Sequence, residues 1–136
     1  MPDAVKGEEV IVSVDDGLGT MLVVEHQQDT TYNTGKEQKK VPTKTGTLAW
    51  QVNAGEEITF SFRKIRPLGA GQARLYELDA SGEAAAVDYD DSAVGGHKRT
   101  GNARVTITEE SSGVHDVVEA SVTIAYEGNV ATTVNV

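Results

Sequence analysis

The fold is decided by the stretch Ala103-Arg104-Val105-Thr106-Ile107-Thr108 and by a second run after it, Val118-Glu119-Ala120-Ser121-Val122-Thr123-Ile124-Ala125-Tyr126. In both runs apolar and polar side chains alternate, which is typical of a β-strand with one solvated face. The segment between them opens Glu109-Glu110-Ser111-Ser112-Gly113, a cluster that favours a turn. The two runs are therefore predicted to pair as an antiparallel hairpin.

The same alternation extends outward from this hairpin. It predicts strands over residues 8–14, 47–52 and 58–63, and extended segments over 21–34 and 83–90. Residues 67–80 change to a helical spacing of leucines and predict one short helix. The predicted fold class is mainly β, an antiparallel sandwich or partly closed barrel of about seven strands with one short α-helix. The residues expected in its core are Trp50, Phe60, Phe62, Leu75, Leu78, Val122 and Ile124.

Residues 35–46 interrupt this pattern with Gly-Lys-Glu-Gln-Lys-Lys-Val-Pro-Thr-Lys-Thr-Gly. No apolar period is present, so the segment is predicted to be a polar projecting loop. Residues 35–66 carry seven basic and three acidic side chains, whereas the whole chain has a net charge of -9. A basic insert in an acidic body suits self-association, in which the loop of one copy meets the acidic face of another. The alternative is a solvated loop whose lysines provide solubility.

Length and composition restrict the class of protein. A chain of 136 residues suits a single domain over 1–136 with short terminal arms. We expect residues 1–7 to lie along the surface or to stay unpaired until a partner binds, and residues 129–136 to pair elsewhere. The absence of cysteine excludes disulfide and thiolate chemistry. No apolar run is long enough to span a bilayer and the first residues do not resemble a signal peptide, so no membrane association and a cytoplasm-like compartment are expected. A net acidic surface argues against nucleic-acid binding, because basic side chains are needed to neutralise the phosphates.

Candidate catalytic or metal-binding residues are few. Asp88, Asp90 and Asp91 precede His97, but their spacing fits no calcium loop, so a solvated acidic turn is favoured. His115 and Asp116 lie near two serines without the context of a nucleophile elbow. Residues 95–101 are glycine-rich but lack Walker spacing, and they are predicted to form a loop. The chain is therefore expected not to be an enzyme and to hold no cofactor or metal.

The order of these elements resembles the major tail tube proteins of long-tailed, siphovirus-type bacteriophages and of gene transfer agents. The similarity lies in the opening Val-Lys-Gly-Glu-Glu-Val-Ile-Val-Ser-Val, in Asp29-Thr30-Thr31 on a long second strand, and in the polar segment before the strand with Trp50. It continues through the strand with Phe62, the single helix, and a closing hairpin that ends at Gly128.

The resemblance implies a structural virion protein that forms hexameric rings. The rings would stack into a tube that conducts DNA without binding it specifically, together with a tape measure protein, a tail terminator and a distal tail protein. The protein would be located in the virion tail after synthesis in the host bacterial cytoplasm.

The resemblance also implies that the loop over residues 35–46 reaches a neighbouring ring. Its expected contact residues are Lys36, Lys39, Lys40, Val41 and Lys44, although this many lysines depart from the family pattern and leave the partner surface open. The candidate acidic partners are Asp15, Asp16, Asp88, Asp90 and Asp91, and the candidate lumen-facing residues are Glu119, Ser121 and Thr123.

Two other classes remain open from the sequence. A capsid decoration protein, or another virion-surface β-sandwich, would have a similar strand pattern. A carbohydrate-binding domain or a small β-barrel enzyme is disfavoured, because the pattern predicts neither exposed aromatic groups nor a convergent pair of acids.

Overall fold

The structure is a computed structural model that describes residues 10–53, 55–91, 95–112 and 117–135. These residues form nine strands and one helix. The elements are β1 (Val10–Asp15), β2 (Met21–Val23), β3 (Gln27–Asn33), β4 (Lys36–Thr43), β5 (Gly46–Asn53), β6 (Glu57–Arg63), α1 (Ala70–Ser81), β7 (Ala84–Asp91), β8 (His97–Ser111) and β9 (Glu119–Val134). No helix in this part of the chain is long and apolar enough to span a membrane.

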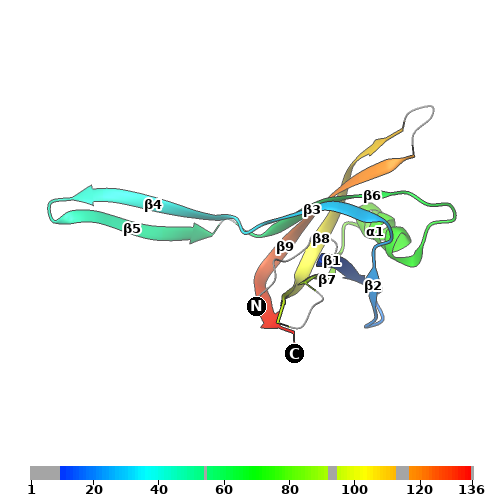
Figure 1. The fold of residues 1–136 in the computed structure, drawn as a ribbon, viewed down its shortest axis with the longest axis horizontal. Coiled ribbons are helices and arrows are strands. Elements are labelled where there is room, and N and C mark those ends of the chain that lie inside the picture. Colours follow the sequence, from blue (N-terminus) through cyan, green and yellow to red (C-terminus); the bar gives the residue numbers. More distant parts are fainter. Residues whose placement is uncertain (1–9, 54, 92–94, 113–116, 136) are drawn as a thin grey trace, which may run out of the picture.

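Seven strands form one curled antiparallel sheet in the order β2-β1-β7-β8-β9-β6-β3, and β4 pairs with β5 in a separate ribbon (Figure 1). The edge strands β2 and β3 are consecutive in the chain and are separated by only Val24, Glu25 and His26. So short a connection can join opposite edges only because the sheet curls until its edges approach each other. The predicted fold class, a mainly β and partly closed barrel with one helix, is confirmed.

The core lies on the inner face of the curled sheet and under α1. The alternation of the central hairpin buries Ala120, Val122 and Ile124, and β6 adds Ile58, Phe60 and Phe62. Leu75 and Leu78 of the helix complete it. Six of the seven predicted core residues are therefore buried. The exception is Trp50, whose side chain is 46% exposed because β5 lies outside the seven-stranded sheet.

The helix is fixed to the sheet through a buried glutamine. The Gln72 side chain donates to the carbonyls of Glu25 at 2.9 Å and Arg63 at 2.8 Å, and it accepts from the Ile65 N–H at 3.2 Å. The Glu25 carboxylate accepts the backbone N–H of Gln72 at 3.0 Å, near the start of α1. The bond from Glu25 pairs one of the backbone N–H groups in the first turn of the helix, which have no partner within the helix.

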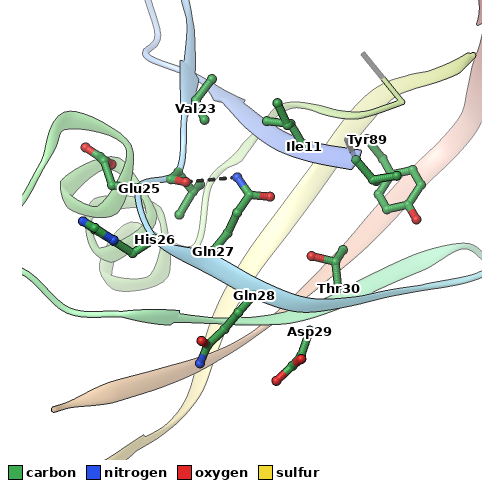
Figure 2. Close-up of a pocket in the computed structure, with 11 residues that line it drawn as sticks. Ile11, Val23, Glu25, His26, Gln27, Gln28, Asp29, Thr30 and Tyr89 are labelled. Atoms are coloured by element: carbon green, nitrogen blue, oxygen red, sulfur yellow. Dashed lines mark hydrogen bonds between the residues drawn. The ribbon is translucent and has the colours of Figure 1, made fainter. Parts of the chain in front are cut away.

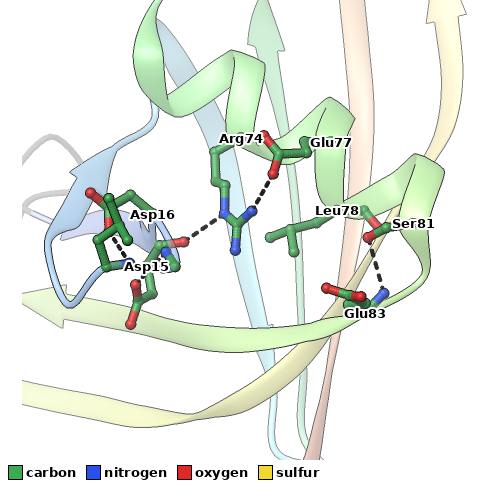
Figure 3. A network of polar contacts seen from close by, with 9 residues as sticks. Asp15, Asp16, Arg74, Glu77, Leu78, Ser81 and Glu83 are labelled. Atoms are coloured by element: carbon green, nitrogen blue, oxygen red, sulfur yellow. Dashed lines mark hydrogen bonds and ion pairs between the residues drawn. The ribbon is translucent and has the colours of Figure 1, made fainter.

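A second connection joins α1 to the end of β1 (Figure 3). Arg74 donates through Nε to the carbonyl of Asp15 at 2.8 Å and pairs with Glu77 at 2.7 Å. The helix ends at Gly82, which has a φ of 71°, and the Gly82 N–H donates to the Leu78 carbonyl. A left-handed residue at this position suits glycine, which has no Cβ.

Several predicted boundaries are wrong. The extended segment 21–34 is broken at Val24–His26, because the chain crosses there between sheet edges. Residues 97–101 belong to β8 rather than to a loop. Residues 129–134 continue β9, in which residues 131–134 pair with 97–100 of the same chain instead of pairing elsewhere. A register shift between Thr100 and Asn102 allows both strands to continue past the glycines. The N-terminal arm, His115 and Asp116 lie outside the described residues.

Candidate assembly surfaces

The strands β4 and β5 form a two-stranded ribbon, here called the arm (residues 36–53), that extends away from the body (Figure 1). Its register runs from Lys36 opposite Asn53 to Thr43 opposite Gly46. The predicted loop at 35–46 is therefore wrong as secondary structure, because most of it is strand β4. Backbone pairing forms this strand without an apolar period, since β5 supplies the partner groups.

The two faces of the arm differ in chemistry. Residues directly opposite in an antiparallel pair share a face. This register places Val41 and Leu48 on the same face as Trp50 and Val52. The other face carries Lys40, Gln38, Gln51, Ala49, Pro42 and Thr47. The first of these surfaces, defined by Val41, Leu48, Trp50 and Val52, is called the Trp50 face.

The predicted contact residues are distributed over both faces and the tip. Lys39 lies opposite Trp50 and is 3.7 Å from the Glu37 carboxylate, with both side chains exposed. Lys40 lies on the other face, and Lys44 lies in the turn between the strands. The structure thus places Lys36, Lys39, Lys40, Val41 and Lys44 on one element, but it does not bring the four lysines to one surface.

The base of the arm is held by residues on both sides of it. Gly35 has a φ of 67°, and a Cβ added there would overlap the carbonyl oxygen of Gly55, so the two ends of the arm approach as closely as only glycine permits. Tyr32 precedes the arm and donates to the carboxylate of Glu56, which follows it, at 2.9 Å. Arg99 of β8 stacks 4.2 Å from the centre of the Tyr32 ring.

Burial and the Glu56 carboxylate raise the pKa of Tyr32 well above its ordinary value. The phenol therefore remains a proton donor to Glu56 at neutral pH. This bond connects the last part of β3 to the residue before β6, and it fixes the direction from which the arm leaves the body.

The predicted acidic patches are only partly available. Asp88 is on strand β7, not in a turn, and only 6% of the residue is exposed. Its carboxylate oxygen Oδ2 lies 3.4 Å from Nζ of Lys98. Asp90 accepts a hydrogen bond from Asn135 at 2.9 Å. Asp15 and Asp16 do lie at a turn, where their carboxylates accept backbone N–H groups of residues 17–20. The prediction of an acidic turn at Asp88, Asp90 and Asp91 is therefore wrong.

The seam where the sheet edges approach carries a groove of about 660 Å³ (Figure 2). The Gln27 side chain crosses the seam, accepting from the Val12 N–H at 2.8 Å and donating to the Val12 carbonyl at 3.0 Å. Ile11 and Val23 form apolar parts of the wall, and Asp29 contributes a carboxylate. Asp29 and His26 adopt left-handed backbone angles that are uncommon for residues other than glycine.

The sequence pattern does not reveal this groove, because the strands that form it meet only when the sheet curls. The available signal was the change from apolar Met21–Val24 to polar residues 25–31. Among the described residues, no group of three or more His, Cys, Asp or Glu side chains is placed to hold a metal ion.

The candidate lumen residues Glu119, Ser121 and Thr123 share the outer face of β9, since they alternate with buried residues of the core. Neighbouring strands add hydroxyl groups to this face, because Thr59 and Thr106 pair with Thr123 and Ser61 pairs with Ser121. Its charges are paired in the chain, with Arg63 lying 3.7 Å from Glu119. The surface is polar, with small hydroxyl side chains at its centre.

No family model and no curated protein sequence matches the chain. Its fold is that of tail-tube subunits in solved structures. The chain is similar to a subunit in the tail of an empty gene transfer agent particle with C6 symmetry, at a TM-score of 0.78 and 14% identity, over 96% of this chain and 99% of that chain. It is also similar to the tail tube of SPP1, at a TM-score of 0.68 and 16% identity, over 98% and 81%.

A third similar structure is the sheath-tube complex of an extracellular contractile injection system, PVC, at a TM-score of 0.59 and 13% identity, over 96% of this chain and 92% of that chain. The similarities cover nearly the whole chain, and they include the single helix and the curled sheet as one unit. The shared property is the fold.

Proposed function

We propose that this chain is a structural subunit of a viral or gene-transfer-agent tail tube, in which rings of six copies stack into a conduit for DNA. The observation that carries the proposal is the similarity over 96% of this chain and 99% of the other to a subunit of a tail with C6 symmetry. This similarity spans nearly all of the 136 residues, so the role proposed for them is structural and not enzymatic.

The arm supports this role. A two-stranded ribbon is marginally stable alone in water, and all its residues from Lys36 to Val52 are exposed in the single chain. Such an element is expected to be covered in an assembly. We assign the arm, with its contact residues Lys36, Lys39, Lys40, Val41 and Lys44, to the contact between neighbouring rings.

The outer face of β9 supports the assignment of the conduit lining. Hydroxyl groups and paired charges at Glu119, Ser121 and Thr123 offer no array of free cations for DNA phosphates. The net charge of -9 per copy adds to this, because a negative tube repels DNA and lets it slide. A tape measure protein inside the tube, a tail terminator and a distal tail protein at its ends are the partners that this role requires, and the virion tail is the location.

Electron microscopy of the purified full-length chain tests the proposal. Hollow tubes, or rings with six-fold symmetry, are expected when the protein is concentrated. A capsid decoration protein would instead remain a monomer or small oligomer and would bind capsid shells. If the chain remains monomeric at millimolar concentration, and also with a tail-tip template, the tube proposal is wrong.

Hydrogen exchange gives an independent measurement on the same sample. Amides of the arm that face solvent in the subunit are expected to exchange fast in the free protein and slowly in tubes, because ordering by a partner offsets their conformational entropy. Equal exchange in both states would remove the arm from the contact between rings.

A further inference from the structure

The arm exposes an apolar surface that nothing in the described part of the chain covers. On the Trp50 face, the exposed fractions are 43% for Val41, 59% for Leu48, 46% for Trp50 and 36% for Val52. The four side chains are neighbours in the register, with Val41 opposite Leu48 and Trp50 between Leu48 and Val52. They form one continuous stripe along the arm.

The opposite face shows that the stripe is not a general property of the arm. Gln38 faces Gln51 there, and Lys40 faces Ala49. The Trp50 face also carries Glu37 and Lys39, but all the exposed large apolar side chains of the arm lie on it. So uneven a distribution is typical of a strand pair that is covered on one side and solvated on the other. Within the described part of the chain both sides of the arm are exposed, so another molecule is the candidate cover for the Trp50 face.

The charge of the arm indicates which molecule covers the Trp50 face. The arm carries Lys36, Lys39, Lys40 and Lys44 against one acid, Glu37, while the chain as a whole has 21 acidic and 12 basic side chains. The body of another copy therefore has the opposite sign to the arm. A surface of opposite charge attracts the arm and orients it before apolar contact forms.

We propose that the arm docks on a second copy of this chain through the Trp50 face, which buries Trp50 and leaves Lys40 and Gln51 on the outer, solvated side. This inference rests on the proposed tube function and adds to it the face that makes the contact. Trp50 is the anchor, since large aromatic residues in desolvated pockets carry a disproportionate share of binding energy. Lys39 lies beside Trp50 at the border of the contact.

Trp50 is the only tryptophan in the chain, so intrinsic fluorescence reports on this residue alone. In the free subunit, emission is expected at the wavelength of a solvated indole with efficient quenching by acrylamide. In tubes, emission is expected to shift to shorter wavelength, and the quenching constant is expected to fall by about threefold or more. Tubes whose Trp50 emission and quenching equal those of the free subunit would overturn the inference while leaving the proposed function intact.

Two adjacent substitutions separate the faces. Trp50→Ser removes the anchor, and Gln51→Ser makes a matched change on the opposite face of the same strand. Both residues are outside the core, so circular dichroism and thermal unfolding are expected to match the unmodified protein. Trp50→Ser is expected to raise the concentration needed for tubes by about tenfold or more, and Gln51→Ser by less than about twofold.

The outcomes distinguish the inference from its premise. Tubes of Trp50→Ser at the unmodified concentration, or an effect of Gln51→Ser equal to that of Trp50→Ser, would overturn the docking face. Failure of the unmodified protein to form tubes under any tested condition would instead overturn the tube function on which the inference rests.

Discussion

The side chain of Gln27 pairs with the backbone of Val12 as a neighbouring strand would, accepting from the Val12 N–H at 2.8 Å and donating to the Val12 carbonyl at 3.0 Å. The same amide also donates to the carbonyl of Val24 at 3.0 Å. One side chain on β3 therefore connects β3 to β1, two strands of the curled sheet between which no backbone pairing is found in the described part of the chain. This contact joins β3 to β1 across the seam, and it connects the two walls of the groove.

Replacing Gln27 by Leu is expected to destabilise the protein by about 1–3 kcal/mol, because the backbone groups at Val12 and Val24 lose a half-buried partner. Urea unfolding measures the change. Gln28→Leu is the matched control, since Gln28 makes no hydrogen bond from its side chain to another described residue, and about 0.5 kcal/mol or less is expected there. Equal losses in the two variants would show that Gln27 does not close the seam.

Gln72→Leu is expected to be more severe, at about 2–4 kcal/mol, because Gln72 is fully buried and serves three backbone groups at Glu25, Arg63 and Ile65. Thermal or urea unfolding measures the loss. The same chemical change on the exposed arm, Gln51→Leu, controls for the gain in hydrophobicity. A loss below about 1 kcal/mol in Gln72→Leu would mean that water or a shifted helix replaces these bonds.

Stability is expected to fall as the pH rises above about 10, the ordinary pKa of tyrosine. Burial raises the pKa of Tyr126, and the negative charges of Asp88 and Glu56 add to the effect. Above pH 10 the unfolded chain therefore loses the Tyr126 proton while the folded chain keeps it, so deprotonation favours unfolding. The stabilising contribution of this tyrosine is fully present below pH 10 and decreases as the pH rises further.

The variant Tyr126→Phe tests whether Tyr126 contributes to this fall in stability at high pH. It loses the hydrogen bond to the Val87 carbonyl, which lowers stability by about 1 kcal/mol at neutral pH. Its unfolding free energy should then decline less steeply above pH 10 than that of the unmodified protein, whereas the two curves should be parallel between pH 7 and 9. Identical slopes above pH 10 would contradict this account.

The sequence was sufficient for the parts of the fold in which local pattern and burial agree. Alternation in Val118–Tyr126 predicted both the strand and its buried side, and the bulk of Phe60 and Phe62 predicted the core. Glycine was misleading, because Gly101 and Gly128 predict the ends of strands that in fact continue past them, to 15 and 16 residues in length. A bulge maintains pairing there, and sequence spacing does not reveal it.

The arm shows why the candidate site was harder to predict. The alternation of Leu48, Trp50 and Val52 is like that of core residues. Alternation predicts that one face of a strand is covered, but it does not predict whether the same chain or another one covers it. Trp50 was therefore assigned to the core of its own chain. For Asp88 the error was in the environment, because its partner Lys98 comes from the next strand and the pair forms only when β7 and β8 align.

The lysines of the arm give a final prediction, because the structure separates two that the sequence groups together. Lys39 is on the Trp50 face and Lys40 is on the opposite face. If the Trp50 face contacts an acidic surface such as the Asp15-Asp16 turn of a neighbouring copy, Lys39→Glu should weaken tube formation more than Lys40→Glu. Each exposed pair contributes only about 0.2–1 kcal/mol, but the contact is repeated in every copy of a ring.

Sedimentation of tubes against protein concentration measures the two single reversals at low and high salt. The gap between Lys39→Glu and Lys40→Glu should narrow as salt rises, because the screening length falls from about 10 Å at 0.1 M to about 3 Å at 1 M. In the Lys39→Glu background, Asp16→Lys should restore assembly if that turn is the partner. If both reversals assemble like the unmodified protein at low salt, the lysines serve solubility and apolar contact alone drives stacking.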